Sequence, residues 1–476
     1  MNKRLRLLLI LAALFITGCM THPPNGEVNT NTKPGEITLN YKILDVPLFA
    51  QATRVWCWAA SGEMIMHYYG EKVPQHVQAN KRFKRGDCGP KTRASGCIKT
   101  AWPEFRRFGF HLNKPKYGAL PWQELVKQIH ANQPVGFSWK WEKCERSKSY
   151  GSHYMVVRGY IILNDMKLVV VNDPLPANPD KTKGGTISIM TYDDYVQFCP
   201  RYTHSYTHYD ITKPGGKLLK QKFLQGPGTV FSKRVPGRRR QGAFTAALES
   251  LELLKALPWP LLKELGFKSK RVVEKISLGK KPLYSLGIGK KPGNAVEAHY
   301  PVKVDKELVN AVTIRKRGGK WAFAVIGDRG ALSAVKAMKE TPAPRGTAFF
   351  MVQIQSMNLT FLAFFSEDED EDEDIILYLI PTHEDPDLTF PLYKPVPAEE
   401  VFLELKYSLE QLAEEKGGAT LKNKLTGYWK EMDKAIQDLE SGEKTGALRG
   451  MKRAVEIINQ VFGELESQEG GENDKG

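Results

Sequence analysis

The segment 46–70 constrains the fold most, because it places a cysteine at the start of a predicted helix. It reads VPLFAQATRVWCWAASGEMIMHYYG, and after Cys57 the apolar residues recur with a helical period, at Ala60, Met64, Ile65 and Tyr68. A helix dipole favours a thiolate at the helix N-terminus, and the thiolate is the reactive form of cysteine. Gln51, six residues before Cys57, carries an amide that can donate to an oxyanion together with the backbone N–H of Cys57. The alternative is that Cys57 is a buried apolar residue of a core helix.

A cysteine nucleophile needs a base, and the base needs an orienting group. His153 precedes an apolar strand predicted over 154–163, and a turn and a second apolar strand follow, ending at Asn172 and Asp173. In a hairpin, the end of the second strand lies beside the start of the first, near His153. Neighbouring strand residues face opposite sides, so only one of Asn172 and Asp173 can point at His153.

Taken together, these motifs resemble papain-superfamily cysteine peptidases. They resemble in particular the bacterial branch related to the double-glycine-leader (bacteriocin-processing) peptidases. The resemblance covers about residues 41–212, and its motifs occur in the expected order: VPLFAQ…WCWAA, a second helix with Gln75, the strand start QPVG, the strand GSHYMVVRGY and the turn VNDP. One departure is His76, which stands where many relatives have a cysteine and which alters the expected disulfide pattern.

The resemblance implies an α+β, papain-like cysteine peptidase fold, in which a helical half carries the nucleophile and an antiparallel sheet carries the base. Cys57 would be the nucleophile, and His153 the general base and acid. Gln51 would complete the oxyanion hole. Asp173 would orient His153, while Asn172 remains the alternative because papain itself uses Asn. The implied activity is hydrolysis of peptide bonds in a peptide or protein substrate, and no cofactor or metal is implied.

Two other functions remain open. An amidase or transpeptidase on the same framework would share every motif. A catalytically inert surface binding lipoprotein is the second alternative, although the intact Gln51, Cys57, His153 and Asp173 argue against it.

The first nineteen residues predict export and a lipid anchor. A basic start with Lys3, Arg4 and Arg6 precedes an apolar stretch, and the segment ends in Ile-Thr-Gly-Cys19, which resembles a bacterial lipobox. We therefore expect a signal peptide over 1–18, acyl chains on Cys19 that hold the protein on a membrane, and a polar tether over 19–40. By resemblance to Gram-negative lipoproteins, Met rather than Asp at residue 20 favours the outer membrane. The alternative is an ordinary signal peptide with a chance cysteine.

The six cysteines all lie within the first 199 residues. With Cys19 and Cys57 set aside, four remain that an exported protein can pair. We favour Cys88–Cys97, because a turn-rich local loop joins these residues, together with Cys144–Cys199. The alternative is four free thiols.

Aromatic and histidine residues near these motifs have more than one interpretation. Four tryptophans flank the motifs and could wall substrate subsites, although core packing is the favoured interpretation: Trp56, Trp58, Trp139 and Trp141. His204 and His208 are four residues apart, but they lie in an aromatic stretch that is expected to be extended, and a metal role is not favoured.

Residues 213–248 predict a linker. They contain nine basic residues, no acidic residue, and several Gly-Pro breaks. With the net charge of +16, an anionic lipid could bind here, but a solvated linker is favoured. Export makes a nucleic-acid partner improbable.

Beyond the linker the sequence predicts an α+β accessory domain of unknown function over 249–396. A helix is expected over 243–265, interrupted at Pro258 and Pro260. Strands are expected over 309–315, 321–326, 347–355, 359–365 and 375–380. The acidic run 367–374 is interpreted as a solvated loop rather than a calcium site.

The C-terminal part predicts a helical bundle over 397–467 and a polar tail over 468–476. Three apolar stripes predict helices over 399–415, 421–439 and 447–465, separated by glycine-containing breaks. Substrate recruitment, docking of a protein partner and autoinhibition all remain open as roles for the accessory domain and the bundle.

Overall fold

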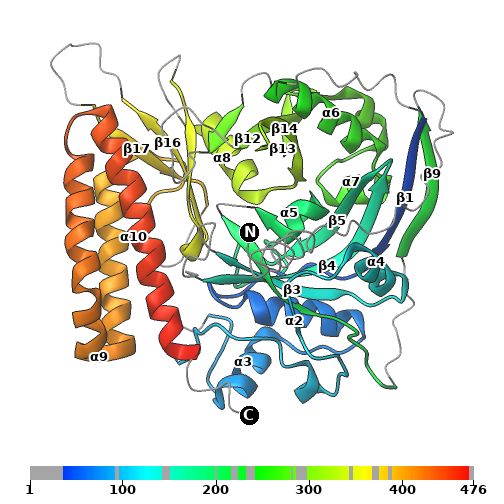
Figure 1. The fold of residues 1–476 in the computed structure, drawn as a ribbon, viewed down its shortest axis with the longest axis horizontal. Coiled ribbons are helices and arrows are strands. Elements are labelled where there is room, and N and C mark those ends of the chain that lie inside the picture. The colour runs from blue at the N-terminus through cyan, green and yellow to red at the C-terminus, as the bar shows by residue number, and fades with distance from the viewer. Residues whose placement is uncertain are drawn as a thin grey trace, which may run out of the picture.

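The computed structural model shows an α+β fold in which one long sheet continues from the N-terminal half of the chain into the C-terminal half (Figure 1). The structure describes residues 36–91, 96–141, 151–198, 201–215, 223–231, 242–279, 282–285, 297–341, 347–366, 375–383 and 389–470. The predicted lipid site at Cys19, the predicted pair Cys144–Cys199 and the acidic run 367–374 lie outside these residues.

Strand β4 (Ser152–Leu163) organises the N-terminal half. One of its edges pairs with β5 (Met166–Asp173); the other pairs with β3 (Val135–Trp141) along the first half of β4 and with β1 (Glu36–Leu44) along the second. The predicted hairpin is confirmed, and it turns at Asn164, whose φ of 51° is left-handed, a region that Asn tolerates. The remaining strands here are β2 (Lys116–Tyr117), β6 (Thr186–Thr191), β7 (Gln197–Phe198), β8 (Tyr202–His208) and β9 (Phe223–Phe231).

Helix α2 (Cys57–Tyr68) packs on β4, with α3 (Gln75–Phe83) on its other side (Figure 1). All residues of α2 except His67 are buried, so the helix is enclosed on every side rather than amphipathic, as expected for a helix between two layers. Met64 and Ile65 join Phe137 and Val156 in the core of this half. The short helices here are η1 (Phe105–Phe108), α4 (Trp122–His130) and α5 (Tyr192–Val196).

Two helices, α6 (Ala243–Ala256) and α7 (Trp259–Glu264), lead into the accessory domain, and α6 begins inside the segment 213–248 that was predicted as a linker. The predicted interruption near Pro258 is confirmed. The predicted hairpin is also confirmed, as β13 (Glu307–Arg317) and β14 (Lys320–Ile326). The other elements of this domain are η2 (Lys270–Lys275), β10 (Ile276–Leu278), β11 (Leu283–Ser285), β12 (Glu297–Val304), α8 (Arg329–Glu340), β15 (Phe350–Ile354), η3 (Gln355–Met357), β16 (Leu359–Phe365), β17 (Leu377–Pro381) and β18 (Val396–Pro397).

Strands β6 and β14 join the two halves. Val325 pairs with Met190, and Ile326 pairs with Ile189, in antiparallel register. Backbone hydrogen bonds therefore continue from β4 through β5, β6 and β14 into the accessory domain.

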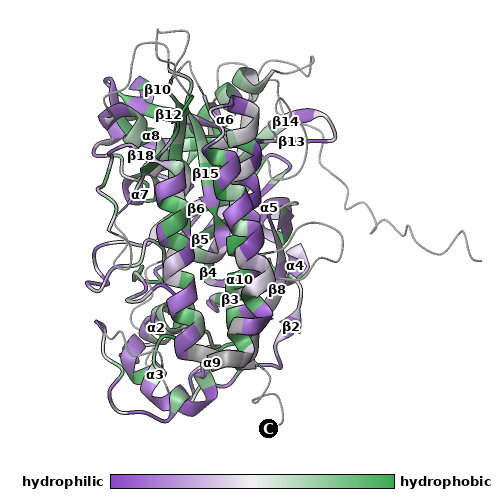
Figure 2. Cartoon of the chain, turned by 90° about the vertical axis from the view of Figure 1, so that its left-hand side faces the viewer, coloured by the Kyte–Doolittle hydropathy of each residue, from purple (hydrophilic) through white to green (hydrophobic). Residues whose placement is uncertain are grey.

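Two long helices, α9 (Ala398–Leu439) and α10 (Lys444–Gly470), form the C-terminal part and stand side by side at one edge of the molecule (Figure 1). The predicted break at Gly417-Gly418 is wrong, because α9 runs through it and the expected three helices are two. Glycine costs about 1 kcal/mol in a helix interior, and packing offsets this cost, since α9 buries Leu409 before the glycines and Leu425 after them in one core with α10. Figure 2 faces this pair and shows hydrophilic and hydrophobic residues alternating along it.

None of the helices within the described ranges combines the length and the apolarity that crossing a membrane requires.

Candidate active site

Cys57 is the first residue of α2 and the free cysteine of the described part of the chain. Its side chain lies in a nearly closed environment, with 7% of the residue exposed. Trp56 occupies the N-cap position and supplies no side-chain cap. The first N–H groups of a helix have no partner within the helix, so the N–H of Cys57 is suitably placed to receive an anionic oxygen.

His153 and Asp173 meet at the open ends of the hairpin. Nε2 of His153 lies 2.7 Å from Oδ1 of Asp173, which also accepts a hydrogen bond of 2.9 Å from the backbone N–H of Leu175. His153 is buried, with 2% of the residue exposed. The structure therefore brings Asp173 to His153, as the resemblance implies.

Asn172 faces the other side of β5. Its buried amide donates to the carbonyls of Val46 and Pro47, at 3.1 and 3.2 Å. These carbonyls begin the segment that leads to Cys57, so Asn172 holds that segment rather than the imidazole.

The pKa of His153 depends on its burial and on two neighbours, Asp173 and Cys57. Burial disfavours the imidazolium, but the charge and hydrogen bond of Asp173, assisted by Cys57, outweigh it and raise the pKa of His153 to about 10. Nδ1 makes no hydrogen bond of ordinary geometry within the described residues. Because Nε2 is engaged by Asp173, Nδ1 is the nitrogen left for the thiol.

Gln51 lies in the segment before α2, and its main chain is tied to the turn after Asp173. Its N–H donates to the carbonyl of Pro174 at 2.9 Å, and its carbonyl accepts from Asn178 at 2.8 Å. The side-chain Nε2 donates to the carbonyls of Thr53 and Arg54, at 2.8 and 2.6 Å. Both amide hydrogens are thus engaged, and the predicted oxyanion role requires Gln51 to exchange one of these bonds.

Gln75 braces the same segment, a role that sequence analysis missed although it noted the residue. Its Oε1 accepts from the N–H of Ala52, and its Nε2 donates to the carbonyl of Ala50, both at 2.8 Å. The side-chain amide of Gln75 thus makes hydrogen bonds to the residues on either side of Gln51, and these bonds fix the main chain of Gln51.

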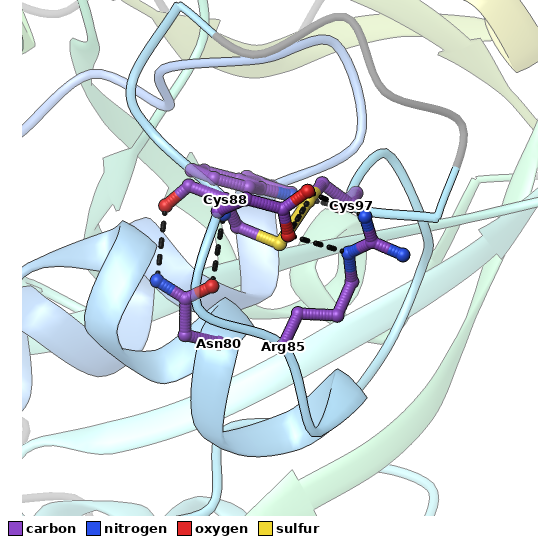
Figure 3. The surroundings of a disulfide bond; sticks show 6 residues. Asn80, Arg85, Cys88 and Cys97 are labelled. Carbon is purple, nitrogen blue, oxygen red and sulfur yellow. Dashed lines mark hydrogen bonds and ion pairs between the residues drawn. A yellow bond between two sulfur atoms is a disulfide. The ribbon is translucent and has the colours of Figure 1, made fainter.

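The predicted disulfide Cys88–Cys97 is confirmed. Figure 3 shows Asn80 bracketing Cys88: its amide donates to the Cys88 carbonyl at 3.1 Å and accepts from the Cys88 N–H at 2.9 Å. The loop also accepts hydrogen bonds from the indole N–H groups on either side of Cys57. Trp56 donates to the Cys97 carbonyl at 2.8 Å, and Trp58 donates to the Lys99 carbonyl at 3.2 Å. The disulfide loop therefore supports the start of α2.

The four flanking tryptophans divide into two pairs. Trp56 and Trp58 are core residues, as favoured. Trp141 stacks on His153, with ring centroids 6.4 Å apart and planes 12° apart, and Trp139 stacks on Tyr202 at 3.9 Å. The second pair also lines a cavity.

His204 and His208 are buried in separate contacts. Nε2 of His204 lies 2.8 Å from Thr207 Oγ1, while Nδ1 of His208 lies 2.7 Å from Tyr154 Oη. Burial lowers the pKa of each to about 4. In the described part of the chain, the grouping with metal-ligand geometry is Asp87, Cys88 and Cys97, whose two sulfurs form the disulfide.

A cavity of about 160 Å³ lies where the N-terminal half meets the accessory domain. The N-terminal half contributes Asp173 and Trp141, and the accessory domain contributes Arg315, Gln353 and Thr360 among others. No local pattern in the sequence identifies these accessory residues, because a pairing between distant strands brings them to the cavity.

Residues 43–197 match the Peptidase_C39 like family. The match covers less than half of the chain and includes Gln51, Cys57, His153 and Asp173. No curated protein matches the chain. The N-terminal half thus resembles C39-type papain-like peptidases, in agreement with its helical layer on an antiparallel sheet, and this family supports a cysteine-peptidase type of hydrolase.

Proposed function

We propose that this chain is a papain-like cysteine peptidase that hydrolyses peptide bonds with Cys57, His153 and Asp173. The observation that carries the proposal is the 2.7 Å contact between His153 and Asp173, beside a free cysteine at a helix N-terminus. This arrangement places a nucleophile, a base and an orienting carboxylate next to one another in that order. Covalent acyl transfer requires this set of groups.

In the acylation step, the Cys57 thiolate attacks the carbonyl carbon of the scissile bond. The carbonyl oxygen becomes an anion, which the uncapped N–H at the start of α2 can bind, joined by Gln51 once its amide exchanges a bond. The imidazolium of His153 then gives its Nδ1 proton to the leaving nitrogen, and the C–N bond breaks. Asp173 holds the Nε2–H throughout and so fixes the ring orientation.

In the deacylation step, neutral His153 takes a proton from water, and the resulting hydroxide attacks the thioester carbon. The C–S bond breaks, the acid product leaves, and the thiolate–imidazolium pair returns. An amine in place of water would give transpeptidation, so the products decide between the two activities.

We propose further that the chain is exported and anchored by acyl chains on Cys19. The lipobox-like segment supports this location, as does the disulfide Cys88–Cys97, because disulfides persist in oxidising compartments. Fractionation of cells that express the full chain tests the proposal: the wild type is expected in the membrane fraction, and Cys19→Ala in the soluble exported fraction. Membrane association of Cys19→Ala equal to the wild type would contradict the anchor.

Labelling of the nucleophile tests the catalytic proposal. The folded protein is treated with iodoacetamide or a peptidyl epoxide at mildly acidic pH, and the modified residue is mapped by mass spectrometry. We expect fast modification of Cys57 in the wild type and slow modification in His153→Ala. His67→Ala is the matched control, because His67 lies on the same helix as Cys57 and outside the site.

Equal labelling in wild type and His153→Ala would show that the thiol is not activated and would overturn the proposal. If Cys57 is activated, incubation with peptides and with added amines then separates hydrolysis from transfer. Acid products indicate a peptidase, and amide products indicate a transpeptidase.

A further inference from the structure

The interdomain cavity lies on one defined side of the catalytic residues. It is lined by Asp173 and by Trp141, whose ring is nearly parallel to that of His153. His153 must deliver its proton to the leaving nitrogen, so the leaving part of the substrate lies on the imidazole side of the thiol. The cavity therefore occupies the leaving-group side of the site.

Two arginines, one from each half of the chain, line this cavity: Arg201 and Arg315. Arg315 is buried, with 3% of the residue exposed. Its Nε donates to Glu297 at 2.8 Å, and its Nη1 donates to Asp194 at 2.5 Å and to the Tyr202 hydroxyl at 3.1 Å. Within the described residues, its Nη2 donates no hydrogen bond.

Arg201 is also incompletely engaged. Its Nη2 lies 2.7 Å from Glu297, and its other side-chain nitrogens make no hydrogen bond with residues that the structure describes. A guanidinium carries five N–H donors in a planar fork that fits a carboxylate. Each of the two arginines therefore keeps donors that the protein does not use.

Three carboxylates balance the charges of the three arginines in this network. Asp194 is shared between Arg315 and Arg317, and Glu297 is shared between Arg315 and Arg201. Asp193 also meets Arg317, so three carboxylates face three guanidinium groups. What the cavity offers to an incoming carboxylate is therefore the unused N–H donors of Arg201 and Arg315.

Two further carboxylates belong to the cavity lining, and each has a partner. Asp173 is occupied by His153. Asp328 caps α8 by accepting the N–H of Ala331 at 3.0 Å. Neither of these two carboxylates is therefore left to occupy the unused donors of the arginines.

We propose that this cavity receives the substrate residue that follows the scissile bond, and that Arg201 and Arg315 bind a carboxylate of that residue. The inference rests on the proposed peptidase function and deepens it. A cavity of about 150 Å³ holds a group about as large as benzene, which matches one residue rather than a long peptide. The carboxylate can belong to an acidic side chain or to the end of the substrate chain, and both have the same chemistry.

Digestion of a synthetic peptide library tests the inference. The library has random sequences and is made twice, with free and with amidated C-termini; products are identified by mass spectrometry. With the full chain we expect cleavage before Asp or Glu to exceed cleavage before Asn or Gln by about tenfold or more, because hydrogen bonds to charged groups are the stronger ones. If the chain-end carboxylate is bound instead, cleavage one residue from the end occurs in the free-acid library and is lost in the amidated one.

Variants connect the preference to the arginines. Arg201→Gln is expected to reduce the preference to less than about threefold. Arg317→Gln is the matched control, since it removes an arginine of the same ion network that does not line the cavity, and it keeps the preference. His153-dependent labelling of Cys57 shows that each variant is folded.

The outcomes separate the inference from the proposed function. Cleavage with no preference for a carboxylate, or a preference unchanged in Arg201→Gln, overturns the inference and leaves the peptidase proposal intact. Absence of any cleavage by the folded, Cys57-reactive protein overturns both.

Discussion

Nε2 of His153 lies 2.7 Å from Oδ1 of Asp173, at the open ends of a hairpin whose turn is at Asn164. The hairpin register sets this contact, because Val156 pairs with Asn172 and the next residue of β5 continues toward the start of β4. The contact fixes which imidazole nitrogen faces the thiol. In the proposed mechanism, the reactivity of Cys57 therefore depends on a pairing between two strands that contain neither Cys57 nor its helix.

Asp173→Asn is expected to lower the pKa of His153 and with it the labelling rate of Cys57. In the wild type Asp173 raises this pKa to about 10 against the effect of burial. Without the carboxylate, burial acts with little opposition and the imidazolium loses its proton at lower pH. The rate of Cys57 alkylation, measured from pH 5 to 10, should fall about tenfold or more at neutral pH, since one pKa unit is a factor of ten. A pH profile unchanged in Asp173→Asn would show that Asp173 does not control the ring.

Asn172→Ala is expected to destabilise the fold without changing the pH profile of labelling. The variant leaves the buried carbonyls of Val46 and Pro47 without their donor, at a cost of about 1–3 kcal/mol. Urea unfolding measures the loss, and Asn172→Asp, which keeps the size but removes the donor, should be similarly unstable. A profile that shifts as in Asp173→Asn, with stability retained, would make Asn172 the orienting group.

Replacement of Cys88 and Cys97 by serine is expected to lower the free energy of unfolding by about 2.5 kcal/mol, from the loop entropy of a short cross-link. Labelling of Cys57 should also slow, because the loop holds the indole N–H groups of Trp56 and Trp58. Thermal unfolding and alkylation of the double variant give the two measurements. Reduction of the wild type by dithiothreitol should reproduce them, and a melting temperature equal to that of the oxidised protein would contradict the bracing role.

Glu297→Ala is expected to cost about 3–5 kcal/mol, as is typical when one partner of a buried ion pair is removed. Glu297 is fully buried and lies between Arg201 and Arg315. Urea unfolding measures the loss, and Glu307→Ala is the matched control, because Glu307 forms an exposed pair with Lys268 and should cost less than about 1 kcal/mol. Equal effects of the two substitutions would show that the buried network does not stabilise the junction.

Local patterns predicted the hairpin that brings His153 to Asp173 and the disulfide, because both connect residues close in sequence. The alternation and the turn residues of 153–173 determine a register, and the register brings His153 to Asp173. Local patterns likewise predicted the hairpin of β13 and β14 and the break between α6 and α7. The sequence left open whether Asp173 or Asn172 faces the imidazole, because the two neighbours differ only in the face of the strand on which they lie. The structure was needed to decide between them.

Local sequence patterns could not predict the contacts between segments that are far apart in the chain. The pairing of Met190 with Val325 joins residues far apart in the chain, and neither strand has a sequence feature that identifies the strand with which it pairs. Gly417 predicted a helix end by its intrinsic cost, yet packing of α9 against α10 outweighs that cost. The enclosure of α2 on all sides likewise depends on packing against α3. The periodicity of apolar residues within α2 could not predict this contact.

The shared sheet has a mechanical consequence. Two domains joined by a linker alone can swing apart, but here opening would break the backbone hydrogen bonds between β6 and β14 and expose the charged groups of Arg315 and Glu297. The opening beside Asp173 is thus expected to keep a constant width. Cutting the chain between the two halves is expected to leave them attached as one particle.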